Sequence, residues 1–382
     1  MKTKAQVFKI IIALCFLLFY TPRVPFTAFV SSSTSIRLDT IVSLLTSVLI
    51  ISYTLTKKLT KGNLFVFLFA ATLLFQGESG IFEKAATFLH YISIILFLYL
   101  IVDIRIYNYE KLLKKFNFFV FFNVAIHFIF LLFDLNYSIT NSLGQNNIIG
   151  AFGILHAPYN FTLLVFSGFI IEYYLHRKLF TPKTLVLFVA IIFAYSRITF
   201  GATIICILFI MYKDGLLKAK NIFSISIGVI FVFAFQSSVP KSLEIFNFFK
   251  TSLSEDPSLG MRLINIERYI EWLDFSKILF GGGARAYTLF ATQYGQPGPF
   301  DNIYLRVLSE VGIVGFMVIA LYLYILFKKM KLNIQLKTYF MFLLIFGLFN
   351  ESALSIKGAQ IVLISILIIK GIFNNAVLSK IK

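Results

Sequence analysis

Several polar and charged side chains open one of the apolar segments of this chain. They follow a stretch rich in turn-forming residues and are Asp301, Asn302, Tyr304, Arg306 and Glu310. Ionisable groups carried into an apolar span cost free energy and commonly mark functional sites. Asp301 and Glu310 are candidates for accepting a proton, and Arg306 for binding an anion. Arg306 and Glu310 are four residues apart, so a purely structural ion pair on one helix face is an open alternative.

Further arginines are candidates for binding a phosphate group. A guanidinium keeps its charge and matches phosphate geometry with two parallel hydrogen bonds. The candidates besides Arg306 are Arg197, Arg262, Arg268 and Arg285. The alternative for Arg197 is an anchor at a membrane interface, and that for Arg268 and Arg285 is a solvated loop charge.

The composition indicates a membrane protein. Of the 382 residues 59% are hydrophobic and only 14% charged, and the mean hydropathy is +0.86, far from the balance of a soluble domain. The net charge of +18 comes from basic residues spread in small groups between apolar runs, which argues against a nucleic-acid partner. Cys15 and Cys206 lie in apolar runs and the four histidines are isolated, so neither a disulfide nor a metal site is indicated.

The apolar segments predict about twelve transmembrane helices, because lipid admits only helices or closed barrels and these runs are too continuously apolar for barrel strands. The expected fold is an all-α polytopic membrane protein in which residues 1–382 form a single integral domain. The predicted segments cover residues 6–21, 40–56, 64–76, 86–104, 116–134, 160–175, 184–197, 199–212, 221–239, 303–327, 338–353 and 359–373.

Every second connection between these segments is basic, which predicts the orientation by the positive-inside rule. It places both termini in the cytoplasm. The basic connections cover residues 57–61, 105–115, 177–183, 213–220 and 328–337.

The run 184–212 tests this parity, because it is too long for one comfortable span and both its flanks are basic. A single crossing would invert every later connection. We therefore expect a tight hairpin of two short helices, with Ser196 and Arg197 at its outer tip.

One long connection, residues 240–302, is predicted on the outer side. It contains several prolines and the glycine triplet Gly281 to Gly283, which mark turns, and residues 262–273 have helical spacing of apolar side chains. Two interpretations of the triplet stay open. Its backbone amides could cradle a diphosphate, or it could be a flexible turn.

The order of these features resembles the O-antigen polymerase and ligase superfamily of bacterial membrane proteins that join lipid-linked saccharides. The resemblance covers roughly residues 145 to 330. Its motifs, in chain order, are Gly150 to Gly153 with His156, Pro158 and Asn160; Tyr195-Ser196-Arg197; Gly260-Met261-Arg262 followed by Trp272; Leu279 to Gly283; and Asp301-Asn302-x-Tyr304-Leu305 running into Glu310-x-Gly312.

One position separates the two branches of that superfamily. Ligases, which attach finished glycan to a lipid A core, typically have His where this chain has Asp301. The resemblance therefore favours the Wzy-type polymerase branch, which couples repeat units carried on undecaprenyl diphosphate outside the bacterial cytoplasmic membrane. A ligase of the same fold is the first alternative. A transporter is the less favoured one, because it is expected to have polar groups near the midplane of broken helices, whereas the charges here cluster at the predicted outer face.

The resemblance and the residues together imply the roles. Displacing a lipid diphosphate from an anomeric carbon requires stabilisation of the departing anion, for which Arg197 and Arg262 are the catalytic candidates, with Asp301 as the base. The expected transfer is metal-independent and uses no cofactor. The lipid-linked oligosaccharide and the bilayer are the expected partners, and a chain-length regulator protein is a further candidate. The expected substrate-binding residues are His156, Asn160, Arg268, Arg285, Asn302, Tyr304, Arg306 and Glu310.

Overall fold

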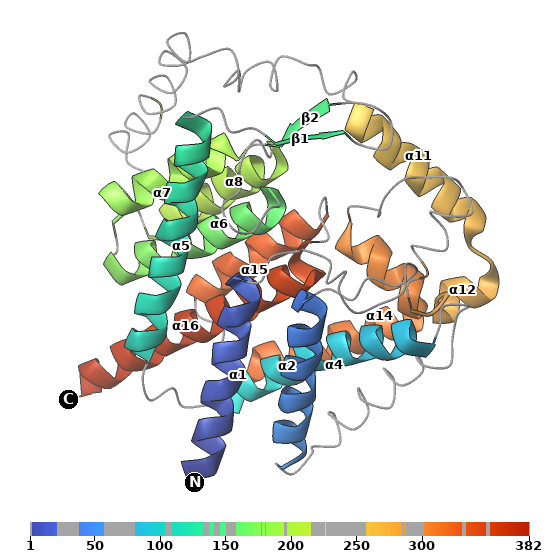
Figure 1. The fold of residues 1–382 in the computed structure, drawn as a ribbon, viewed down its shortest axis with the longest axis horizontal. Coiled ribbons are helices and arrows are strands. Elements are labelled where there is room, and N and C mark those ends of the chain that lie inside the picture. The colour runs from blue at the N-terminus through green and yellow to red at the C-terminus, as the bar shows by residue number, and fades with distance from the viewer. Residues whose placement is uncertain are drawn as a thin grey trace. The chain divides into compact units, whose positions relative to one another are not determined.

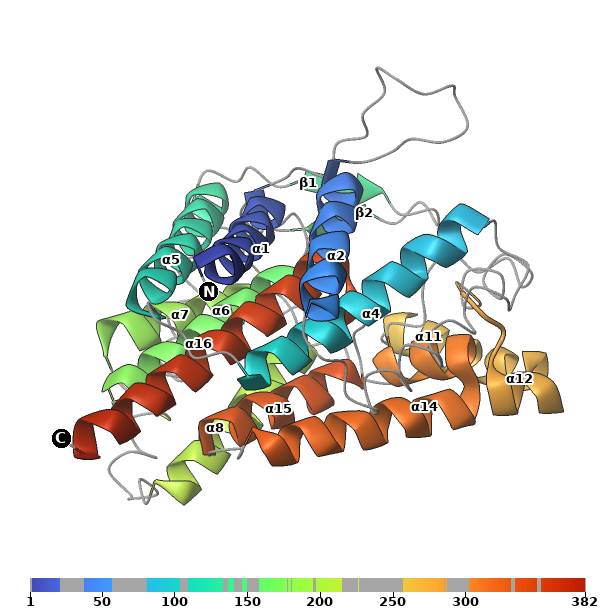
Figure 2. The same cartoon turned by 90° about the horizontal axis from the view of Figure 1, so that it is seen from below.

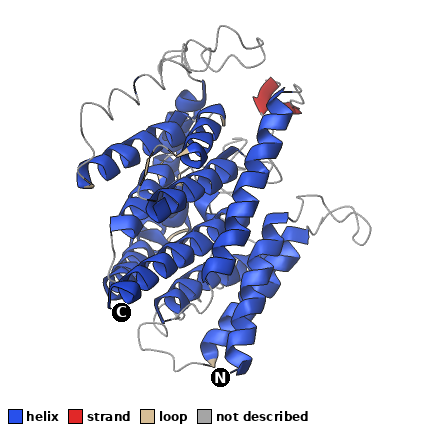
Figure 3. Ribbon diagram, turned by 90° about the vertical axis from the view of Figure 1, so that its left-hand side faces the viewer, coloured by secondary structure: helices blue, strands red, loops and turns tan. Residues whose placement is uncertain are grey.

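A computed structural model shows a largely helical chain (Figures 1 and 3). It divides into two compact units. Unit 1 comprises residues 1–112, 262–333 and 347–382, and unit 2 comprises residues 113–261 and 334–346. The residues that the structure describes are 2–20, 38–56, 81–103, 109–132, 137–140, 146–149, 158–176, 178–179, 181–194, 197–214, 226, 257–284, 286, 302–330, 334–348 and 352–381.

Unit 1 holds the helices from both ends of the chain together with the described part of the long connection. Its elements are α1 (Lys2–Tyr20), α2 (Leu38–Leu55), α4 (Ile81–Asp103), most of α11 (Pro257–Trp272), α12 (Phe275–Phe280), α14 (Ile303–Lys329), the short 3-10 helix η5 (Ser352–Leu354) and α16 (Ile356–Ile381).

Unit 2 holds the middle of the chain and one later helix. Its elements are most of α5 (Tyr109–Leu132), the strands β1 (Tyr137–Thr140) and β2 (Asn146–Ile149), α6 (Pro158–His176), α7 (Pro182–Phe193), α8 (Arg197–Lys213) and α15 (Ile334–Gly347).

Most predicted apolar segments are helices. Three of the described helices are long and apolar enough to cross a membrane, over Lys84–Val102, Glu110–Phe130 and Ile303–Lys329. The predicted segment 64–76 lies outside the described residues, and 221–239 lies almost entirely outside them. The antiparallel pair β1 and β2 adds a small hairpin that an all-α expectation does not contain. The result is a helical membrane protein; the number of spans stays a prediction.

The helix directions in unit 1 agree with the alternating topology. His90 in the first half of α4 contacts the carbonyl of Leu354, just before α16, whereas Lys370, farther along α16, donates to carbonyls at the C-terminal end of α4. Helices α4 and α16 therefore run parallel. The ring of Phe8, near the start of α1, lies 6.2 Å from that of Phe97, in the last third of α4. Helix α1 therefore runs against them, as the parity predicts.

Helices α5 and α6 of unit 2 run in opposite directions. The amide of Asn117, near the start of α5, donates to Glu172 near the end of α6 at 2.6 Å. The rings of His127 and Phe161 meet at the other ends of the two helices, 4.5 Å apart. This is the arrangement expected of consecutive spans joined by the connection that contains β1 and β2.

Helices α6 and α8 run in the same direction. The hydroxyls of Thr162 and Thr199, near the starts of the two helices, are 3.4 Å apart. Near the other ends, the hydroxyl of Tyr173 donates to the carboxylate of Asp214. A helix that connects them must therefore run backwards, because it starts where α6 ends and finishes where α8 starts.

Helix α7 is that connecting helix, so the predicted hairpin is present. Lys183 at its start lies 5.9 Å from the ring of Phe121 in α5, and the rings of Phe193 at its end and Phe128 farther along α5 are 6.2 Å apart. Helix α7 thus runs parallel to α5 and opposite to α8. It begins with a capping box at Thr181, which satisfies amides that a helix start leaves free.

The hairpin allows a direct test of orientation. In a background with Cys15 and Cys206 replaced by serine, we expect Ser196→Cys to react with an impermeant thiol reagent added outside intact cells. The exposed Lys178 lies at the opposite end of α7, so Lys178→Cys is the matched control and should react only after permeabilisation. The reverse pattern would contradict the predicted outer tip.

Candidate functional site

The site in unit 1 is built around a break in α14. Gly312 has φ 65° and ψ −176°, so the helix is interrupted at this residue. In an unbroken helix the carbonyls of Ser309 and Glu310 would accept from amides four residues later. The break removes that geometry inside a buried stretch, where an unpaired carbonyl costs about 1–3 kcal/mol. Another part of the chain must therefore supply donors.

The glycine triplet supplies these donors. The amide of Gly282 donates to Ser309 O at 2.7 Å, and that of Gly283 donates to Glu310 O at 3.1 Å. The amide of Gly281 donates back into the last turn of α12 at 2.9 Å. All three amides are therefore used within the chain. The hypothesis that they cradle a diphosphate is wrong for this conformation, because a cradle needs free donors.

Both sides of this contact require glycine. A Cβ on Gly281 would lie 2.4 Å from Glu310 O, and a Cβ on Gly312 would lie 2.4 Å from Leu279 O. Each of these glycines also has positive φ, which residues with side chains adopt only at a cost. The two backbones thus approach more closely than any other residue type permits. This contact, between residues 279–283 and the break in α14, is called the glycine clamp below.

An aromatic pair supports the clamp from the long connection. A Cβ on Gly282 would lie only 2.7 Å from the ring of Trp272, at the end of α11. The other neighbours of this indole are the ring of Tyr269, 5.9 Å away, and the ammonium of Lys277 over its face at 4.5 Å. Burial raises the pKa of Tyr269, so this phenol stays neutral. The predicted helix over 262–273 is present and begins earlier, at Pro257.

Helix α12 begins at a cap that the sequence reasoning missed. Asp274 accepts from the amide of Lys277 at 2.8 Å and pairs with the ammonium of the same residue at 3.1 Å. The hydrogen bond from the Lys277 amide is the main reason why the pKa of Asp274 lies below its usual value. The signal was readable, since Asp directly before a helical segment is a preferred N-cap residue.

A buried carboxylate lies just before the break. Glu310 is 0% exposed. It accepts a hydrogen bond of 2.5 Å from the hydroxyl of Tyr91 on α4, and its other oxygen lies 3.9 Å from Nε of Arg306. The ion pair that the spacing allows is thus present. The other partner of Glu310, Tyr91, is 219 residues away in the sequence. No local pattern could have identified this hydrogen bond.

Two further polar groups lie on other helices of unit 1. His90 directly precedes Tyr91 in the sequence. Its Nε2 atom lies 2.7 Å from the carbonyl of Leu354. Lys357, in the first turn of α16, is 1% exposed. A lysine is almost never fully buried unless its charge is compensated. The sequence reasoning missed both residues, because His90 was judged isolated and Lys357 fell just outside the predicted segment 359–373.

Asn302 and Tyr304 have clear structural positions at the start of α14. The side-chain oxygen of Asn302 accepts from the amides of Tyr304 and Leu305, at 2.8 and 3.0 Å, and its amide donates to Leu348 O at 2.7 Å. Asn302 therefore caps α14 and ties it to the chain beyond α15. The half-buried ring of Tyr304 meets Phe316 edge-on at 6.5 Å. Contact of either residue with substrate stays a prediction.

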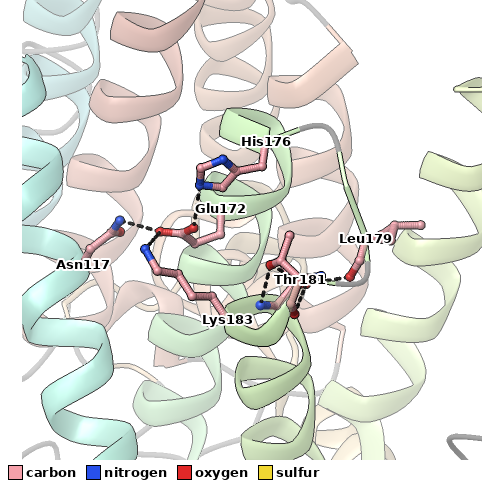
Figure 4. Close-up of polar contacts among 7 residues, drawn as sticks. Asn117, Glu172, His176, Leu179, Thr181 and Lys183 are labelled. Atoms are coloured by element: carbon pink, nitrogen blue, oxygen red, sulfur yellow. Dashed lines mark hydrogen bonds and ion pairs between the residues drawn. The ribbon is translucent and has the colours of Figure 1, made fainter.

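Unit 2 holds a second buried carboxylate, Glu172, drawn in Figure 4. It is 1% exposed. Asn117 donates to one of its oxygens at 2.6 Å, Lys183 lies 3.7 Å from the same oxygen, and His176 lies 3.3 Å from the other. These partners come from α5, α6 and α7. The network joins three helices at the end of α6 that the charge pattern assigns to the cytoplasm.

The other predicted site residues are placed only in part. Arg197 begins α8 in unit 2, and Arg262 lies in α11 in unit 1. Their convergence stays a prediction. Arg268 is half-buried on α11, and Asn160 is buried in the first turn of α6. His156, Arg285 and Asp301 lie outside the described residues.

Comparison with known proteins finds a family match for the region that contains the glycine clamp. Residues 184–320 match the family model of the O-antigen ligases. Over these residues the predicted resemblance to the O-antigen polymerase and ligase superfamily is confirmed. The matched region runs from α7 through the long connection to beyond the break in α14. Members of this superfamily are glycosyltransferase-like membrane enzymes of polysaccharide synthesis. No curated protein and no solved structure matches the chain.

The clamp predicts an unusually costly glycine substitution. Gly312→Ala combines positive φ with a Cβ at 2.4 Å from a backbone oxygen, so we expect it to destabilise the protein by about 1–3 kcal/mol for the strain and more for the clash. The matched control is Gly201→Ala in α8, where a Cβ meets nothing within 4 Å. Thermal unfolding in detergent would be followed by the fluorescence of the single tryptophan. The unfolding temperature should fall strongly for Gly312→Ala and change little for Gly201→Ala. Equal stability of the two variants would contradict the clamp.

Proposed function

We propose that this protein is a polysaccharide polymerase that joins undecaprenyl-diphosphate-linked oligosaccharide repeat units at the outer face of the bacterial cytoplasmic membrane. The observation that carries the proposal is the family match over residues 184–320, combined with aspartate at position 301. The match supports lipid-linked glycan transfer. The aspartate favours the polymerase branch over the ligase branch.

The reaction forms a bond between an acceptor hydroxyl and the anomeric carbon of a lipid-linked sugar. The bond between that carbon and the diphosphate oxygen breaks, and its electron pair stays on the diphosphate. Arg197 and Arg262 would stabilise this anion through bidentate hydrogen bonds. Arg268, Arg285 and Arg306 are supporting candidates from the same matched region.

The proton of the acceptor hydroxyl goes to Asp301 in this proposal. Sequence alone left Glu310 as an equal candidate. In the structure Glu310 is fully buried and held by Tyr91 and Arg306, so it lacks access to a bulky sugar and is better suited to holding α14. Asp301 directly precedes Asn302, the cap of α14, at the end of the helix that faces outward in the predicted topology. A base must reach the proton that it accepts.

The ligase reaction is the second candidate, and one observation favours it: the matching family model is described as O-antigen ligase. Both reactions use a lipid-diphosphate donor and differ in the acceptor, which is a second lipid-linked unit for a polymerase and a lipid A core for a ligase. A transporter role has less support, because the matched family transfers glycans. Under the proposed function the expected partners are the lipid-linked oligosaccharide, the bilayer and a chain-length regulator.

Deleting the gene separates the two reactions. A strain without the polymerase should retain core that carries a single repeat unit, while the ladder of longer chains disappears from a gel of surface polysaccharide, because ligation continues when extension stops. Bare core together with long free polymer on the lipid carrier would instead establish the ligase. Complementation with the unaltered gene is the control.

Conservative arginine variants test the diphosphate contacts in the same strain. Arg197→Lys and Arg262→Lys keep the charge and lose the planar fork, so we expect the ladder to fall by at least tenfold at normal protein level. Arg177→Lys, on a connection assigned to the cytoplasm, is the matched control and should leave the ladder unchanged. Full ladders from both site variants, at wild-type abundance on an immunoblot, would exclude these arginines as the diphosphate contacts.

A further inference from the structure

The position of α12 along α14 gives its depth relative to the bilayer. Helix α14 contains 27 residues and ends at Lys328 and Lys329, which mark one polar boundary. A hydrocarbon core of about 30 Å takes about 20 helical residues, so its other boundary lies near residue 308. The break at Gly312 is farther in. Because Gly281, directly after α12, packs against Gly312, the end of α12 lies just inside the hydrocarbon boundary.

Large apolar side chains of α11 and α12 are exposed near this level. Ile270 is 63% exposed, Phe275 78% and Phe280 50%. Phe280 directly precedes Gly281, so its exposed ring is fixed in depth by the contact of Gly281 with α14. Such side chains in water would form an apolar patch that soluble surfaces rarely carry. In lipid they would be in a favourable environment.

The membrane-spanning helix α14 also carries exposed apolar side chains. Directly after the break, Ile313 is 48% and Met317 62% exposed, as expected of side chains that face lipid. Helix α12 lies beside α14 in both views (Figures 1 and 2). Two helices in contact thus both expose apolar side chains close to the predicted hydrocarbon boundary.

We propose that α12, with the end of α11, is inserted into the outer leaflet of the membrane rather than held above it in water. Burying the ring of Phe275 or Phe280 in lipid contributes favourable transfer free energy, since each aromatic side chain removes a large apolar area from water. Lys277 and Asp274 pair at the start of the same helix, where a charged pair can remain at the headgroup level. The long connection is thus anchored to the bilayer as well as to α14.

Spin labels on single cysteines test this insertion without any assay of activity. In a background with Cys15→Ser and Cys206→Ser, the protein would be labelled at Phe275→Cys and reconstituted into bilayers. Collision rates with oxygen, which concentrates in hydrocarbon, would be compared with those for a water-soluble nickel chelate. The matched control is Glu267→Cys, an exposed charged position on α11, eight residues before Phe275.

Insertion predicts a ratio of oxygen to nickel collisions several-fold higher at residue 275 than at residue 267. Equal ratios, with nickel collisions dominant at both positions, would overturn the proposal. Low collision rates with both reagents at 275 would also overturn it, and would mean that protein covers the patch. Dipolar coupling between labels would then identify a second copy as the cover, and its absence a segment of the same chain. A position measured in this way stands whether or not the protein is a polymerase.

Discussion

The reciprocal contact between Gly281 and Gly312 is the constraint on which the rest of the candidate site depends. It lets two backbones meet at a distance that a single Cβ on either residue would prevent. The amides of the glycine triplet then replace the hydrogen bonds that α14 loses at its break. A turn that could have bound a ligand in isolation is instead part of the helix packing. The long connection is thereby fixed to a membrane-spanning helix at the buried Glu310, whose carbonyl accepts from the amide of Gly283.

Among the residues whose burial is described, each unit contains one nearly inaccessible glutamate, and the two are compensated differently. Glu310 has Tyr91 and Arg306 as partners, whereas Glu172 has an amide, an ammonium and an imidazole from three helices. An uncompensated charge in a helix bundle would cost several kcal/mol, so these partners are needed for folding. Both networks join helices that are distant in sequence. They therefore fix helix packing at two places where a helix carries charge inward.

Anchoring α12 in the outer leaflet would give the long connection two supports, the glycine clamp and the bilayer. A lipid-linked donor presents its diphosphate at the headgroup level, where its polyprenyl chain leaves the membrane. A connection held at that level could bring Arg262 and Arg268 of α11 to the diphosphate without a large movement. Local placement of this kind matters, since a shift of about 1 Å in a reacting group can cost a hundredfold in rate.

The sequence by itself determined the helical membrane class, most helix positions and the resemblance to the superfamily over residues 184–320. Long apolar runs in lipid can satisfy the hydrogen bonds of their backbone only as helices. The charge pattern of the connections predicted the relative directions of the helices. The observed contacts agree with these directions, both among α1, α4 and α16 and among α5, α6, α7 and α8. The break in 184–212 was also readable, because both flanks are basic. The helix over 262–273 followed from the spacing of its apolar side chains.

Only the tertiary structure decided what the polar groups do. The glycine triplet gave the same pattern for a cradle and for a turn, and its hydrogen bonds to residues nearly 30 positions away settle its role. Tyr91 and Lys357 carried no local signal, since their importance comes from burial beside elements distant in the chain. Hydrogen bonding and burial are non-local properties, whereas apolar periodicity and charge pattern are local. That physical difference explains why the sequence predicted the helices and the fold decided the contacts.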